Sequence, residues 1–70
     1  MSSMEKRLAV FSQLPLRAQL ATITASKANP VLSQNAEYLA SLEKIHEESL
    51  AAATQSEKIA YDKAKELLGG

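Results

Sequence analysis

The feature that most constrains the fold is a stretch from Pro30 to Leu68 that contains no internal glycine or proline. Asn29 precedes it, and asparagine is a preferred N-cap residue. Proline suits the first helical position, where its missing N–H costs nothing, and the two glycines that end the chain are typical of a helix C-terminus. The pattern therefore predicts one α-helix over residues 30–68, about 55–60 Å long by the usual helical rise per residue.

Apolar residues fall on one broad face of this predicted helix, and charged residues fall on the opposite face. The apolar face is formed by Val31, Leu32, Leu39, Leu42, Ile45, Leu50, Ala53, Ala60, Ala64, Leu67 and Leu68. A single helix cannot bury such a face against itself. A second element, or another chain, is therefore expected to cover it.

The first part of the chain predicts two shorter helical pieces. Ser2 and Glu5 have the spacing of a capping box, so a helix is expected over residues 3–13. Pro15 interrupts this helix, because proline removes a helical hydrogen bond and clashes with the preceding turn. The apolar stripe also changes direction beyond it. A second piece is predicted over residues 15–28, joined by a kink, with a continuous bent helix as an alternative.

The short turn before Pro30 is typical of antiparallel helices. The sequence thus predicts an all-α fold in which residues 1–70 form a single helical hairpin, with a Pro-kinked first arm and a long second helix. The second arm is longer than the first by about 18 Å. That overhang would carry Ile59, Tyr61, Leu67 and Leu68. We expect a second copy to cover it, giving an antiparallel homodimer with a four-helix, coiled-coil-like arrangement.

The composition removes several ways of stabilising a small domain. The chain has 70 residues, no cysteine and one histidine, which excludes disulfides and cysteine-containing zinc sites. Oligomerisation is the remaining common means of stabilising so short a chain. No metal or cofactor is expected. The chain lacks a signal-peptide pattern and an apolar run long enough for a bilayer, so we expect a cytoplasmic protein with no membrane span.

The charge distribution disfavours nucleic acid as the main partner. Four basic residues and one acid give residues 1–29 a net charge of +3, whereas four lysines and seven acids give residues 30–70 a net charge of −3. The two halves are therefore expected to lie side by side. A hairpin that binds nucleic acid stays a third hypothesis, and it would use Lys6, Arg7, Arg17 and Lys27.

Two polar residues fall on the apolar face of the predicted long helix. His46 has a side chain suited to proton transfer or to a pH switch, but no carboxylate and hydroxyl are spaced to complete a catalytic set. We interpret His46 and Asn35 as residues that set helix register or oligomeric state. Glu43 lies three residues before His46, and Glu47 and Glu48 follow it, but the sequence has no second cluster of this kind, so these acids are interpreted as a solvated face rather than a metal site.

Partner-binding candidates come from the aromatic residues and the chain end. Phe11, Tyr38 and Tyr61 are the three aromatic residues of the chain, and aromatic side chains are enriched at binding hot spots. Leu67 and Leu68 join them because they lie in the predicted overhang. The double substitution Leu67→Ala with Leu68→Ala is expected to weaken association while residues 4–58 stay helical.

The amphipathic segment at the N-terminus allows three interpretations. Its apolar residues are Met4, Leu8, Phe11 and Leu14, with Lys6 and Arg7 beside them. The segment could pack into the chain's own core, dock into a groove on a partner, or lie on an anionic membrane surface. Packing into the core is the interpretation that we favour.

The outline of a short helix, a turn at Asn29 and Pro30, and a long final helix resembles type III secretion needle subunits and their small co-chaperones. The resemblance is one of topology and assigns no residues. It implies a secretion or virion assembly subunit, or a co-chaperone. Small phage-encoded regulators of host proteins have a similar outline. The leading hypothesis is a non-enzymatic homodimeric regulator or inhibitor that occupies a surface of a partner protein.

Overall fold

Short helices joined by brief turns make up the described part of the chain. The computed structural model describes residues 3–67, and within that range it holds four α-helices, one short 3-10 helix and no strand. The elements are α1 (Ser3–Ser12), α2 (Leu16–Ala28), η1 (Leu32–Gln34), α3 (Ala36–Ala52) and α4 (Gln55–Leu67). The prediction of an all-α fold is therefore confirmed.

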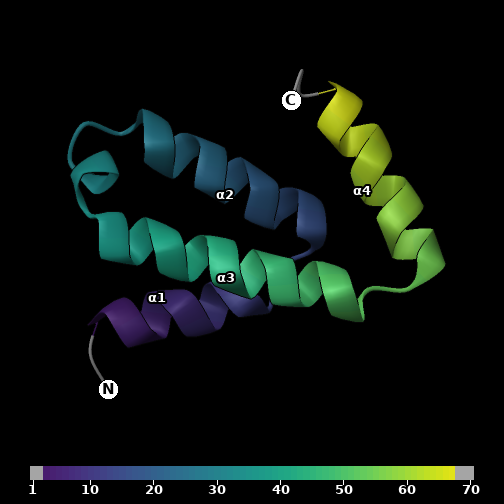
Figure 1. Cartoon of the computed structure of the whole chain (residues 1–70), viewed down its shortest axis with the longest axis horizontal. Helices are drawn as coiled ribbons and strands as arrows, with labels where there is room; N and C mark the ends of the chain where they lie inside the picture. Colours follow the sequence, from purple (N-terminus) through teal and green to yellow (C-terminus); the bar gives the residue numbers. More distant parts are fainter. Residues whose placement is uncertain (1–2, 68–70) are drawn as a thin grey trace.

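The first two helices meet at Pro15. Helix α1 ends at Ser12, and α2 begins at Leu16, close to the boundaries expected for the two helical pieces. Pro15 precedes α2 with φ −58° and ψ 155°, an extended backbone that interrupts the helical path. Figure 1 shows α1 and α2 running in opposite directions across the view. A turn at Pro15 thus takes the place of the predicted kink.

The prediction of a single helix over residues 30–68 is wrong at its start. Asn29 does cap a helical turn, since its Oδ1 accepts from the backbone N–H groups of Val31 (2.9 Å) and Leu32 (3.0 Å), but that turn is only η1. The longer helix α3 has its own N-cap, Asn35, whose Oδ1 accepts from the N–H of Tyr38 at 3.0 Å. Each asparagine ends one segment and begins the next.

The predicted long helix is broken a second time between α3 and α4. Ala53 follows α3 with φ −71° and ψ 149°, which is extended rather than helical. Thr54 and Glu57 then form a reciprocal capping box. The Thr54 N–H donates to Glu57 Oε1 (3.1 Å), and the Glu57 N–H donates to Thr54 Oγ1 (3.2 Å). The chain changes direction here, so the expected long overhang does not form.

Helix α3 lies at the centre of the arrangement. Helix α2 runs beside it in the opposite direction, α1 contacts it as well, and α4 turns back to contact α2 (Figure 1). The Cα atoms extend over 33 × 26 × 14 Å, so the molecule is flattened along one axis. A flat arrangement leaves much of each helix surface open to solvent.

The apolar core lies where α1, α2 and α3 meet. Its buried residues are Phe11, Ile23, Tyr38 and Leu42, and Leu8, Leu32, Leu39 and Ile45 pack around them. Leu42 is fully buried. The N-terminal segment therefore contributes Phe11 and Leu8 to the core, whereas Met4 stays at the surface.

One ion pair joins the basic first half of the chain to the acidic second half. Lys27 Nζ lies 2.9 Å from Glu43 Oε1, with both side chains more than half exposed. An exposed pair of this kind contributes about 0–1 kcal/mol. Between residues 3 and 67, no helix has the length and hydropathy that a membrane span requires.

Candidate functional site

A chain of buried hydrogen bonds connects all four helices. Gln19 is fully buried on α2, and its Nε2 donates to the carbonyl oxygen of Phe11 (3.2 Å) and to Ser49 Oγ (3.1 Å). Gln19 Oε1 lies 2.9 Å from Nδ1 of His46 on α3, and Nε2 of His46 lies 3.0 Å from the hydroxyl of Tyr61 on α4. We call these five residues the polar network.

The polar network fixes the tautomer of His46. The Phe11 carbonyl can only accept, so it must face the Gln19 amide N–H group, which leaves Gln19 Oε1 facing the histidine. His46 Nδ1 therefore carries the proton and donates, while Nε2 accepts from the hydroxyl of Tyr61. The neutral imidazole satisfies every one of these bonds. Within residues 3–67, no buried side-chain nitrogen or oxygen lacks a hydrogen-bond partner.

Burial favours the neutral forms of both His46 and Tyr61. Burial lowers the pKa of His46 below its ordinary value, and the positive charge of Lys65 lowers it further. Burial also raises the pKa of Tyr61, with a smaller contribution from the carboxylate of Asp62. The two rings are tilted at 56° with their centroids 5.3 Å apart. With both nitrogens of His46 engaged, this geometry holds α4 in place and leaves neither nitrogen for proton transfer to a bound molecule.

The structure buries the three aromatic residues that the sequence offered for partner contact. Phe11 and Tyr38 belong to the apolar core, and Tyr61 is buried against His46. The expectation that Tyr61 would be covered by another chain is therefore wrong, because its own chain covers it.

Asn35 and the chain end also differ from expectation. Asn35 is exposed, so its predicted inward position is wrong, and its side chain caps α3. A role for Asn35 or His46 in oligomeric state stays a prediction. Leu67 is 89% exposed at the end of α4 and is thus available to a partner. Leu68, the other terminal candidate, lies outside the described residues.

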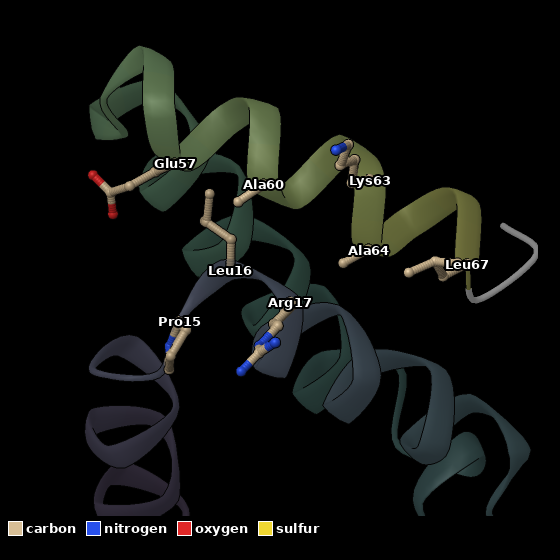
Figure 2. A pocket seen from close by; sticks show the side chains of 8 residues that line it. All are labelled: Pro15, Leu16, Arg17, Glu57, Ala60, Lys63, Ala64 and Leu67. Carbon is tan, nitrogen blue, oxygen red and sulfur yellow. The ribbon is translucent and has the colours of Figure 1, made fainter.

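A groove lies between the beginning of α2 and helix α4. Its apolar surface comes from Leu16 and Pro15 on one side and from Ala60, Ala64 and Leu67 on the other, and its volume is about 390 Å³. Figure 2 shows Leu16 and the two alanines between the helices, with Leu67 at the far end of α4.

The groove continues along α2. A second hollow of about 390 Å³ shares Arg17, Ala64 and Leu67 with the first and extends past Ala18 and Ala21. We call the two hollows together the α2/α4 groove. The volume of each hollow falls in the range of sites that bind small ligands, about 300–1,000 Å³.

Charged side chains border the α2/α4 groove. Arg17 lies on α2 and Lys63 on α4, on opposite sides of the apolar surface, and Glu57 lies at one end (Figure 2). The carboxylate of Glu57 accepts from the Thr54 N–H and hydroxyl, and these hydrogen bonds lower its pKa below the ordinary value. Neither Arg17 nor Lys63 forms an ion pair with any residue between 3 and 67.

Neither the polar network nor the α2/α4 groove was predicted from the sequence. The T-x-x-E pattern from Thr54 to Glu57 is a recognised helix start and marked the break that creates the groove. Gln19 carried no such signal, because nothing local distinguishes it from an exposed glutamine. Arg17 was assigned to a possible nucleic-acid surface, and Lys63 was not singled out.

Residues 3–67 contain no cluster of three or more His, Asp or Glu side chains that could hold a metal ion. Comparisons with protein-family models, with curated proteins and with solved structures found no match.

Proposed function

We propose that this chain is a non-enzymatic protein-binding module, a small regulator or inhibitor, that contacts its partner through the α2/α4 groove. The observation that supports this proposal most is an apolar groove between two helices, bordered by Arg17 and Lys63, two cations that form no ion pair with any residue from 3 to 67. Grooves of this kind accept the apolar face of a partner helix.

The location of the polar groups supports binding rather than chemistry. His46 is engaged on both nitrogens and is only 8% exposed, and it does not line the groove. Among residues 3–67, the lining of the groove includes one carboxylate, Glu57, and no serine, threonine or cysteine. A surface of this composition can bind apolar groups with charged flanks.

Self-association is the alternative to a different partner protein at this groove. The homodimer expected from the sequence rested on an overhang that α4 does not form, but Leu67 and the groove still present apolar surface that a second copy could cover. Sedimentation velocity at micromolar concentrations tests this directly. A dimer in the wild type that is lost in Ala60→Arg would place the second copy in the groove.

The test of partner binding uses two matched alanine substitutions. Ala60→Arg fills the groove from α4, whereas Ala40→Arg places the same side chain on an exposed position of α3 that does not line it. Affinity capture from the native host, followed by mass spectrometry, should recover a protein with the wild type and with Ala40→Arg but not with Ala60→Arg. Recovery by both variants would contradict binding through the groove, provided that circular dichroism shows both to be folded.

No structural feature favours the assembly-subunit hypothesis over this one. The resemblance to needle subunits rested on a long final helix, and that helix is divided into η1, α3 and α4. Nucleic-acid binding is disfavoured by the apolar surface between Arg17 and Lys63, which a phosphate backbone would not use.

A further inference from the structure

We infer that the occupant of the α2/α4 groove is an acidic amphipathic α-helix of a partner protein, with carboxylates on both sides of its apolar stripe. This inference rests on the proposed function, because it specifies the chemistry of the partner. Three properties of the groove carry it: the charge of its borders, the size of its apolar residues, and its length.

The borders of the groove carry positive charge that no ion pair within the described part of the chain neutralises. Arg17 and Lys63 are exposed on opposite sides, and neither pairs with a carboxylate among residues 3–67. Carboxylates on each side of an apolar stripe would therefore lie opposite cations.

The one acid at the groove does not cancel this effect. Glu57 lies at the end near Pro15, and its carboxylate already accepts hydrogen bonds from Thr54 as part of the cap of α4. It leaves the stretch between Arg17 and Lys63 positive. Glu57 should thus disfavour a carboxylate at its own end of the groove and favour a defined placement of the bound helix.

The apolar surface of the groove suits another helix. Four of its residues are alanines, Ala18, Ala21, Ala60 and Ala64. Small side chains let a third helix approach closely, at the lower part of the usual 8–10 Å spacing between helix axes. Leu16 and Leu67 lie at its ends and can pack against larger side chains of the occupant.

The walls favour a helix over an extended peptide. Both walls are helices, whose backbone groups bond within the helix, and residues 3–67 contain no sheet edge to which a strand could be added. From Glu57 to Leu67, the α4 wall is about 15 Å long by the helical rise, which matches about ten residues of a bound helix. Such a helix presents three apolar side chains at i, i+3 or i+4, and i+7.

The experiment measures binding of synthetic peptides to the full-length protein. The acidic probe is a helical peptide of about fourteen residues with Leu at i, i+3, i+4 and i+7 and Glu beside them. A matched peptide carries Lys in place of Glu, and a second control keeps Glu but replaces Leu by Gln. We expect the acidic peptide to shift the amide NMR signals of Ala18, Ala21, Ala60 and Ala64. The Lys peptide should bind about tenfold more weakly at low salt, with the difference shrinking as salt is added.

Charge reversal on the protein should reverse this preference. Arg17→Glu with Lys63→Glu is expected to bind the Lys peptide more tightly than the Glu peptide. The matched control, Lys44→Glu with Lys58→Glu, changes two exposed lysines that do not line the groove and should keep the wild-type preference. All four positions are exposed, so circular dichroism should show the same helix content in both variants.

The outcomes separate this inference from the proposed function. Equal binding of the Glu and Lys peptides in the groove would overturn the inference that the partner is acidic. The proposed function would still be supported if Ala60→Arg abolished capture of a host protein. Peptide shifts outside the groove, or a groove already filled by a second copy in sedimentation, would overturn the inference as well. Absence of any peptide binding, together with host capture that Ala60→Arg does not change, would overturn both.

Discussion

Gln19 connects three helices through a single buried amide. Its Nε2 reaches the last turn of α1 at Phe11 and the hydroxyl of Ser49 on α3, and its Oε1 reaches His46. An apolar residue in this position would leave Nδ1 of the buried His46 without its partner and would remove one of the two hydrogen bonds to the Phe11 carbonyl. The periodicity of α2 gave no reason to expect it, because a polar residue on a helix is placed on the solvent side by default.

Gln19→Ala should destabilise the fold strongly. It removes the partner of His46 Nδ1 and one of the two partners of the Phe11 carbonyl, and it leaves a cavity, so a loss of about 2–4 kcal/mol is expected. Urea unfolding followed by circular dichroism measures the change. Gln13→Ala, which alters an exposed glutamine, should stay within about 0.5 kcal/mol of wild type. Equal effects at the two positions would contradict the role of the polar network.

The lowered pKa of His46 gives the fold a pH dependence with a defined sign. Between the lowered pKa and the ordinary value of about 6.5, the unfolded chain binds more protons than the folded chain. Stability is therefore complete above about pH 6.5 and falls as the pH drops through that value toward the lowered pKa. The groups that bond to the imidazole or act on its charge are Gln19 on α2 and Tyr61 and Lys65 on α4. None of them supplies a carboxylate that would favour the imidazolium.

Thermal unfolding at pH 7.5 and pH 5.5 checks this sign. The wild type should unfold at a lower temperature at the acidic pH, since protonation of His46 removes the acceptor for the hydroxyl of Tyr61. His46→Gln should be less stable at pH 7.5 but nearly insensitive to this pH change. A pH effect of the same size in both proteins would assign it to other groups.

At the scale of the elements, helix ends decide the fold more than helix interiors do. The stretch from residue 30 onward has a continuous apolar face and no glycine or proline, yet it forms η1, α3 and α4. Asn35 ends one segment by capping the next, and Thr54 with Glu57 does the same. These side chains offer the backbone an alternative to a continuing helix, and tertiary packing of α4 on α2 favours that alternative.

Thr54→Ala should act mainly on α4. Loss of the cap costs about 1 kcal/mol, and the reciprocal bond to Glu57 is weakened with it. Hydrogen exchange of the α4 amides should become faster while exchange in α3 changes little. Ser56 is exposed in the first turn of α4 and takes no part in the cap, so Ser56→Ala should leave hydrogen exchange in both helices as in wild type. Equal acceleration in α3 and α4 would mean that the helices unfold together.

At the scale of the whole molecule, the sequence predicts that the chain is helical better than it predicts how the helices pack together. The all-α class and the division of the first part at Pro15 follow from periodicity and from the chemistry of proline. The return of α4 onto α2 depends on contacts between residues such as Leu16 and Ala60 that lie far apart in the sequence. No local pattern specifies such contacts, so the α2/α4 groove could not be found before the structure.

The same arrangement explains why the predicted hairpin needs no second chain to bury Tyr61. A helix that continued straight past Ala53 would carry Tyr61 away from His46 and leave both side chains in water. The break at Thr54 returns Tyr61 to the imidazole instead, with an O to N distance of 3.0 Å. The energy of burying one aromatic side chain thus comes from within the chain.

The position of Tyr61 also predicts the order in which the helices come together during folding. Among the described residues of α4, Tyr61 is the one that is buried, and its partner His46 is oriented by Gln19 from α2. We therefore expect helix α4 to dock after α2 and α3 have come together. We expect α4 to form its contacts after the folding transition state, so substitutions at Tyr61 should speed unfolding and leave the folding rate nearly unchanged.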